Sequence, residues 1–152
     1  MIECTFELND KPISMFKIGA RSFPAFSGLG SHLNRRSAVC SPNLGPIPPG
    51  RYYILDRQTG GRLGPLLDRI KGRQDWLALY ADDGRIDDYT FCNRVQRGSF
   101  RLHPSGRAGI SQGCIVIHSQ ADFYRLRALL NCHRPVAIPD LGIQAYGKVV
   151  VK

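Results

Sequence analysis

Residues 100–118 of this chain read FRLHPSGRAGISQGCIVIH, and both the fold and the chemistry can be worked out from this stretch. Residues 99–103 have the pattern of a strand that ends at His103. A glycine-rich loop follows, and Cys114 then opens a run of apolar residues that predicts a buried strand over 114–118. Such a loop between two strands could bring a cysteine nucleophile next to its histidine base.

The rest of the chain predicts a mainly β (α+β) fold with a compact sheet core. Five further segments, in which apolar residues alternate or cluster between turn residues, predict strands: 4–8, 13–18, 51–56, 76–80 and 146–151. The first two are joined by turn residues, Asn9 to Pro12, which predicts an antiparallel hairpin. One helix is predicted after the cysteine, with Ser119 as N-cap, Asp122 in the first turn and one apolar face up to Asn131.

Three segments carry no regular pattern. Residues 19–50 are rich in Gly, Pro, Ser and Asn, which predicts a long loop without a helix. Residues 57–75 predict another loop with one helical turn around 66–71, and residues 89–94 do not decide between strand and loop. No repeat and no change of composition divides the chain, so we expect a single domain over residues 1–152.

Composition narrows the class of protein. The apolar fraction of 43% and the charged fraction of 22% are ordinary for a folded globular chain. A formal net charge of +9 indicates that the protein works near an anionic polymer, surface or partner. The basic residues are scattered along the sequence, however, so we expect no nucleic acid as partner. The N-terminus lacks the basic and apolar regions of a signal peptide, and no apolar run could span a bilayer. We therefore expect synthesis in the cytoplasm and no membrane insertion.

The five cysteines are an odd number without a CxxC pair, which argues against a zinc ribbon and a thioredoxin-like motif. At least one thiol stays unpaired within the chain, and synthesis in a reducing cytosol is the simplest account. We expect neither a metal ion nor a cofactor. A metal site built from His103, Cys114 and His118 would lack the closely spaced ligand pairs that usually mark zinc.

Cys114 ends the sequence Ser111-Gln112-Gly113-Cys114. Gly113 would let backbone N–H groups converge beside the sulfur, where the oxyanion of an acyl intermediate could sit, and Ser111 could hydrogen-bond across the same loop. The alternative is that Cys114 is a buried small hydrophobic residue without a chemical role. His118 is the rival base, because a continuous strand would place it on the same face as Cys114.

The order His103, Ser111, Gly113, Cys114, followed by an apolar run, resembles the active-site signature of L,D-transpeptidases. Four segments resemble, more closely, the L,D-transpeptidase-like effectors of type VI secretion systems: 26–28, 45–52, 102–104 and 109–115. Gln112 departs from the wider transpeptidase pattern, which carries a second histidine directly before the Gly-Cys pair. The departure leaves open how the oxyanion loop is held.

The resemblance implies an L,D-transpeptidase-like sandwich or barrel core with one main helix after the cysteine. It implies acyl transfer by Cys114 with His103 as base, and a supporting loop of Ser111, Gln112 and Gly113. The implied substrates are peptidoglycan tetrapeptide stems, hydrolysed or exchanged at the bond between meso-diaminopimelate and D-Ala. The implied setting is a toxin that type VI secretion machinery delivers to the periplasm of rival bacteria, with an immunity protein as partner.

Two other classes of protein stay as alternatives. A papain-like cysteine peptidase or amidase would place its cysteine at a helix N-terminus with the histidine far downstream, whereas His103 precedes Cys114. A non-catalytic basic binding module, with an inert Cys114, would predict salt-dependent retention on DNA or heparin and no thiol of lowered pKa.

Overall fold

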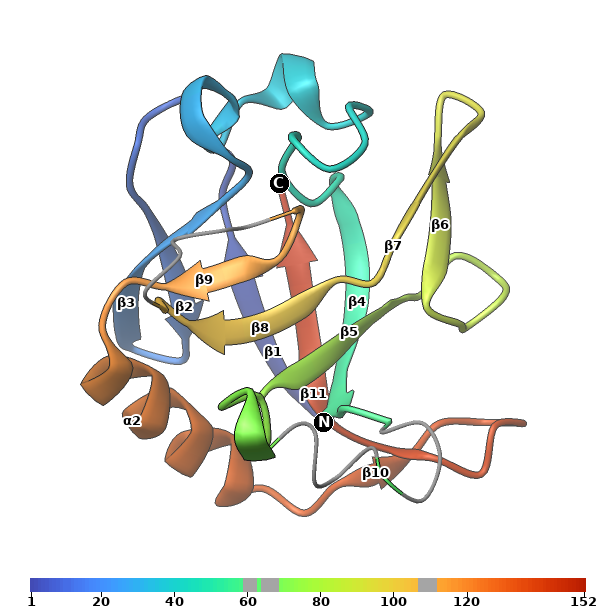
Figure 1. Cartoon of the computed structure of the whole chain (residues 1–152). Helices are drawn as coiled ribbons and strands as arrows, with labels where there is room; N and C mark the ends of the chain where they lie inside the picture. The colour runs from blue at the N-terminus through green and yellow to red at the C-terminus, as the bar shows by residue number, and fades with distance from the viewer. Residues whose placement is uncertain (59–62, 64–68, 107–111) are drawn as a thin grey trace.

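In the computed structural model, eight strands of the described residues close into a mixed β-barrel (Figure 1). The structure describes residues 1–58, 63, 69–106 and 112–152. Around the barrel the order is β1-β2-β3-β9-β8-β5-β4-β11, and β11 pairs with β1 to close it. The barrel strands are β1 Ile2–Phe6, β2 Ser14–Ile18, β3 Arg21–Ser27, β4 Gly50–Asp56, β5 Leu77–Ala81, β8 Arg101–Pro104, β9 Ile115–Ile117 and β11 Gln144–Val151.

Two pairs of barrel strands are parallel, β1 with β11 and β8 with β9, and the other barrel pairs are antiparallel. In the β8–β9 pair Leu102 lies opposite Ile115. Because the two strands run in the same direction, Cys114, directly before β9, lies beside the start of β8. The parallel pairing therefore places the two strands of residues 100–118 side by side, with their starts next to each other.

The barrel interior is filled by side chains that alternate along the strands with residues facing outward. Its members are almost fully buried and come from every barrel strand, among them Phe6, Phe16, Ile54, Leu102 and Ile115. Burying an aliphatic or aromatic side chain of this size contributes about 1.5–3 kcal/mol. The core therefore fixes which face of β8 and β9 points inward and which faces out.

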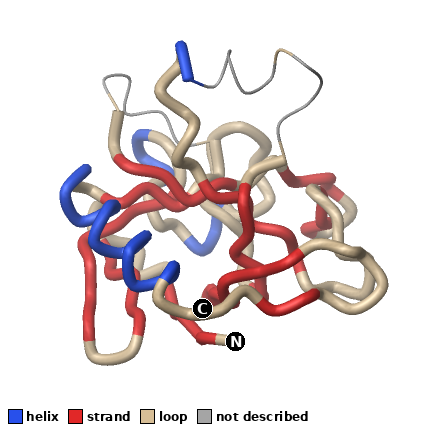
Figure 2. Tube along the Cα trace, turned by 90° about the horizontal axis from the view of Figure 1, so that it is seen from below, coloured by secondary structure: helices blue, strands red, loops and turns tan. Residues whose placement is uncertain are grey.

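The predicted helix is confirmed as α2, Gln120–Asn131. Ser119 is its N-cap, and the Ser119 hydroxyl accepts a hydrogen bond from the Asp122 backbone N–H at 3.3 Å. The buried face of α2 packs Phe123, Leu126 and Leu130 into the barrel core. Figure 2 shows α2 on one side of the strands. Among the described residues, no helix has the length and apolar character needed to cross a membrane.

The mainly β fold with one main helix is thus confirmed, and the strands predicted at 4–8, 13–18, 51–56, 76–80 and 146–151 all form, with shifted ends. The helical turn predicted around 66–71 falls largely outside the described residues.

The prediction of one long loop over residues 19–50 is wrong at its start, where β3 forms. Phe23, Ala25 and Ser27 are buried and alternate with less buried neighbours, because β3 lies between β2 and β9. Pro24 obscured this strand in the sequence, yet its carbonyl accepts a hydrogen bond from the His118 backbone N–H at 2.9 Å. After β3 the segment does run as loop, with two short 3₁₀ turns, η1 Gly30–His32 and η2 Arg36–Ala38.

A second, two-stranded sheet projects from the barrel on the side opposite α2 (Figures 1 and 2). It is the antiparallel hairpin of β6, Tyr89–Cys92, and β7, Val95–Gly98. The sequence left β6 undecided and did not predict β7. It also did not predict β10, Val136–Ala137, which pairs with β11 outside the barrel. Strands this short carry too few residues for a period of two to be visible.

A disulfide joins Cys40, in the segment after η2, to Cys92 at the end of β6. The sequence did not indicate this pairing, since synthesis in a reducing cytosol was the simplest account of the cysteines. Cys4, Cys114 and Cys132 are thiols in the structure. Arg97 of β7 reinforces the same connection, because its guanidinium donates to the backbone carbonyls of Val39, Gly45 and Pro46. The disulfide and the Arg97 hydrogen bonds therefore hold the β6–β7 hairpin against residues 39–46.

Reduction of the Cys40–Cys92 disulfide is expected to lower the free energy of unfolding by about 4 kcal/mol, because the bond closes a loop of some fifty residues in the unfolded chain. Urea denaturation of the wild type with and without reductant measures the difference. The Cys40→Ala/Cys92→Ala variant should unfold at the same urea concentration in both conditions, and Cys132→Ala should respond to reductant as the wild type does. A wild-type midpoint that does not move with reductant would contradict the expectation.

Candidate active site

The outward face of β8 and β9 carries the residues on which the sequence analysis centred. Leu102 and Ile115 lie opposite each other and point into the core, both fully buried. Successive side chains of a strand point to opposite faces, so Arg101 and His103 face outward on either side of Leu102. Cys114 precedes Ile115 and shares that outward face. The fold therefore gives His103 and Cys114 a common face on adjacent strands.

The outward face forms one wall of a cavity of about 980 Å³, which His103 and Cys114 both line. No Asp or Glu is among the described residues that line this cavity. Five cationic side chains do line it: Arg57, Lys71, Arg73, Arg97 and Arg101. A second, smaller cavity of about 230 Å³ lies beside β1 and β2 and contains neither His103 nor Cys114. The larger cavity thus combines a thiol, an imidazole and an excess of positive charge.

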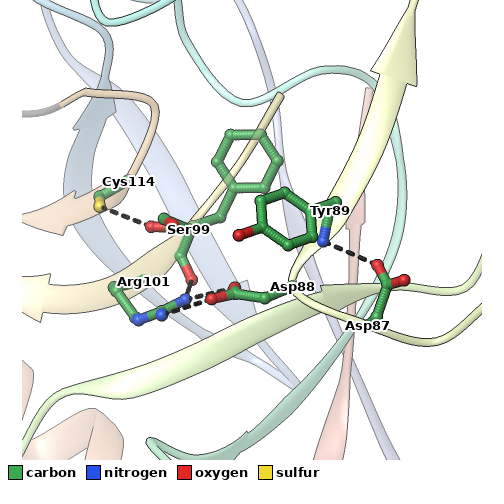
Figure 3. Close-up of polar contacts among 7 residues, drawn as sticks. Asp87, Asp88, Tyr89, Ser99, Arg101 and Cys114 are labelled. Carbon is green, nitrogen blue, oxygen red and sulfur yellow. Dashed lines mark hydrogen bonds and ion pairs between the residues drawn. The ribbon is translucent and has the colours of Figure 1, made fainter. Parts of the chain in front are cut away.

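Cys114 is nearly buried, with 9% of its surface exposed. Its Sγ donates a long hydrogen bond to the Ser99 carbonyl, with Sγ and O 3.9 Å apart (Figure 3). Burial raises the pKa of the Cys114 thiol, while a hydrogen bond from the Arg101 backbone and the Arg101 charge act in the opposite direction. The resting side chain is therefore a protonated thiol that needs help to ionise.

His103 is held by two contacts. Its Nδ1 lies 2.8 Å from the Pro104 carbonyl oxygen, and because a carbonyl only accepts, Nδ1 carries the proton. The Trp76 ring stacks on the imidazole with centroids 4.0 Å apart and planes 13° from parallel. Burial lowers the pKa of His103, so the ring is neutral at pH 7 and its Nε2 is left as the basic nitrogen.

Gly113 occupies a position that admits little else. Its φ of +101° belongs to the region that favours glycine, and a Cβ there would lie 2.7 Å from Arg97 Nη2 and 2.8 Å from Phe100 Cε1. The Gly113 carbonyl accepts a hydrogen bond from the buried Ser27 hydroxyl at 3.3 Å. The backbone that leads into Cys114 is therefore fixed by contacts with β3, β7 and the start of β8.

The other predicted members of the loop are less defined. Ser111 lies outside the described residues, so its predicted hydrogen bond across the loop stays a prediction. Gln112 is exposed and lines the cavity. The predicted oxyanion site at the N–H groups of Gly113 and Cys114 likewise stays a prediction.

The structure separates His118 from the cavity. β9 ends at Ile117, and His118 is exposed and is not among the described residues that line the cavity. The same position disfavours the metal site once considered from His103, Cys114 and His118. Within the part of the chain that the structure describes, no three His, Cys, Asp or Glu side chains are grouped as metal ligands.

Sequence reasoning missed three residues that surround the dyad: Trp76, Ser99 and Arg101. Trp76 is the only tryptophan of the chain and directly precedes β5, but a stacking partner 27 positions away leaves no local pattern. Arg101 could have been found from the strand period, since it lies two residues before His103 and must share its face. Ser99 contacts Cys114 through a backbone carbonyl, which no side-chain pattern reveals.

A mixed barrel with a cysteine and a histidine on one wall of a cationic cavity fits the L,D-transpeptidase-like class that the sequence resembles. Comparison with protein families supports this class directly, because the family described as the Tlde1 domain matches residues 21–141. The chain belongs to the Tlde1 domain family, the L,D-transpeptidase-like effectors of type VI secretion systems. The matched region contains five of the eight barrel strands, β3, β4, β5, β8 and β9, and all of α2, whereas β1, β2 and β11 lie outside it. No curated protein and no solved structure gave a match.

Proposed function

We propose that this chain is a cysteine acyl-transfer enzyme that acts on peptidoglycan stem peptides, at the bond between meso-diaminopimelate and D-Ala. The observation that carries the proposal is the common outward face of β8 and β9, which presents His103 and Cys114 to one cavity. The bond from Nδ1 of His103 to the Pro104 carbonyl supports it, because it leaves Nε2 to take a proton.

In the proposed reaction, Nε2 of His103 accepts the Sγ proton of Cys114, and the thiolate attacks the carbonyl carbon of the scissile amide. The C–N bond of the tetrahedral intermediate then breaks, and the imidazolium returns the proton to the departing D-Ala amine. The stem is left as a thioester on Cys114. Water releases a tripeptide stem (L,D-carboxypeptidase activity), whereas the amine of a D-amino acid releases an exchanged tetrapeptide (L,D-transpeptidase activity).

The charge of the cavity supports a stem peptide as substrate. Stem peptides carry several carboxylates, and the described lining has five cationic side chains and no acidic one. Arg57, Lys71 and Arg73 supply positive charge in addition to the two arginines next to the dyad. The same charge would suit the non-catalytic binding module, but that function gives no role to the buried, oriented imidazole that lines the cavity together with Cys114.

We further propose that residues 1–152 act as one catalytic domain, since β1 and β11, from opposite ends of the chain, pair to close the barrel. As a member of a family of type VI effectors, the protein is proposed to act in the periplasm of rival bacteria. An immunity protein that occludes the cationic cavity would be its partner in the producing cell.

Mass spectrometry of tetrapeptide stems incubated with the purified protein tests the proposed function. We expect tripeptide stems and released D-Ala, and, after addition of a second D-amino acid, tetrapeptides that carry it at the last position. Tripeptide stems serve as the control substrate, because they lack the bond to be cut. Unchanged tetrapeptides would overturn the proposal, and cleavage of ordinary L-peptides instead would favour the papain-like alternative.

A further inference from the structure

We propose that Arg101 is a positioning residue for Cys114: its guanidinium, fixed in place by Asp88 on the same outward face, stabilises the Cys114 thiolate by its positive charge. This inference rests on the proposed function, in which Cys114 is the nucleophile. It adds a residue to the site that neither the family match nor the sequence motif assigns.

The register of β8 and β9 places Arg101 next to Cys114. Leu102 lies opposite Ile115 in the parallel β8–β9 pair, so the residues that precede them, Arg101 and Cys114, are neighbours on the outward face. Both line the same cavity. The β8 backbone contacts the sulfur on this side, since Sγ donates to the Ser99 carbonyl and receives a hydrogen bond from the Arg101 backbone. Figure 3 shows Arg101 and Cys114 together beside the start of β8.

A two-pronged ion pair fixes the guanidinium in place. Nη1 and Nη2 of Arg101 donate to Oδ1 and Oδ2 of Asp88, each at 2.7 Å, and Nη1 also donates to the Phe100 carbonyl at 2.8 Å (Figure 3). The Arg101 side chain is 15% exposed and that of Asp88 25%. A pair this sheltered is weakly screened by solvent, and the forked geometry is one that lysine cannot reproduce. Arg101 therefore holds its charge near Cys114 without reorganising.

Among the described charged and titratable groups near the sulfur, Arg101 favours the Cys114 thiolate most. Burial raises the pKa of Cys114, and the Arg101 backbone bond and charge lower it by more than Asp88 raises it; Arg73 lowers it further. His103 is neutral in the resting site, because burial lowers its pKa, and it is positively charged only while it holds the proton taken from Cys114. Arg101 keeps its positive charge before, during and after that transfer, so it can stabilise the Cys114 thiolate throughout.

Alkylation of Cys114 by iodoacetamide across the pH range, followed peptide by peptide, tests this role without any peptidoglycan substrate. In Arg101→Met the pH of half-maximal alkylation should rise by about one unit, and the rate at pH 7 should fall about tenfold, because the loss of a neighbouring opposite charge shifts a pKa by roughly that much or more. Arg101→Lys should recover part of the loss. Arg125→Met, which removes an exposed arginine of α2, should titrate as the wild type does.

A folded Arg101→Met variant whose Cys114 titrates like the wild type would overturn the inference. Should that variant not fold, as judged by circular dichroism, Arg101→Gln keeps N–H donors toward Asp88 and is held to the same result. The readout also separates this inference from the proposed function. If the wild type processes stems but Cys114 of Arg101→Met titrates as in the wild type, only the role of Arg101 is contradicted. If the wild type leaves stems intact, the proposed function is contradicted.

Discussion

Cys114→Ala should abolish the conversion of tetrapeptide to tripeptide stems, lowering kcat/KM by about 10³-fold or more. Without Sγ no thioester can form, and no other thiol lines the described part of the cavity. The release of D-Ala by purified protein is the first measurement. Intact-mass spectrometry is the second, because the wild type should carry an acyl adduct during turnover and the variant should not.

Cys132→Ala is the matched control, since Cys132 is an exposed thiol that follows α2 and lies outside the described cavity lining. It should process stems at the wild-type rate. When each protein is directed to the periplasm of a sensitive bacterium, the Cys132 variant should be toxic and the Cys114 variant harmless. Processing by Cys114→Ala at more than a few per cent of the wild-type rate would contradict its assignment as nucleophile.

His103→Gln should lower kcat by about 10²- to 10⁴-fold, the usual contribution of a positioned general base. The pH profile gives a second readout. His103 accepts a proton only when it is neutral, so activity falls as the pH falls through its pKa, which burial lowers below 6.5. The acid limb of the wild-type kcat/KM profile should therefore have its midpoint below pH 6.5, and the residual activity of His103→Gln should lack that limb.

His118→Gln is the control for the base, because His118 was the rival candidate and is exposed at the end of β9. Its kcat should stay within about twofold of the wild-type value, as for surface substitutions away from a site. If His118→Gln lost activity and His103→Gln kept it, the roles proposed for the two histidines would have to be exchanged.

The elements that the sequence predicted are those defined by neighbouring residues, such as a helix cap, an apolar face or a turn. The α2 helix was visible from Ser119, Asp122 and one apolar face, and the first hairpin from alternation around a turn. The sequence also predicted that the strand end at His103 and the strand start at Cys114 frame one loop, and both residues line the same cavity. What the sequence could not show is that β8 and β9 pair in parallel, which decides that Arg101 lies beside Cys114.

The features that were missed depend on partners far away in the chain. β3 is a strand because β2 and β9 flank it, and Pro24 hides this from any local reading. The Cys40–Cys92 disulfide and the stacking of Trp76 on His103 likewise join residues with no common motif. Tertiary contacts of this kind override local propensity, so only the folded chain reveals them.

The pairing of β1 with β11 also determines when the barrel can be completed during synthesis. β11 lies between β4 and β1, so before it emerges from the ribosome both of those strands keep an unpaired edge. Exposed edges invite pairing with other chains. Because β1 waits for β11, the barrel closes only once β11 has been made, and closure depends on contacts between residues far apart in sequence, which form slowly. The nascent protein therefore passes through an open sheet that is more prone to aggregate than the finished barrel.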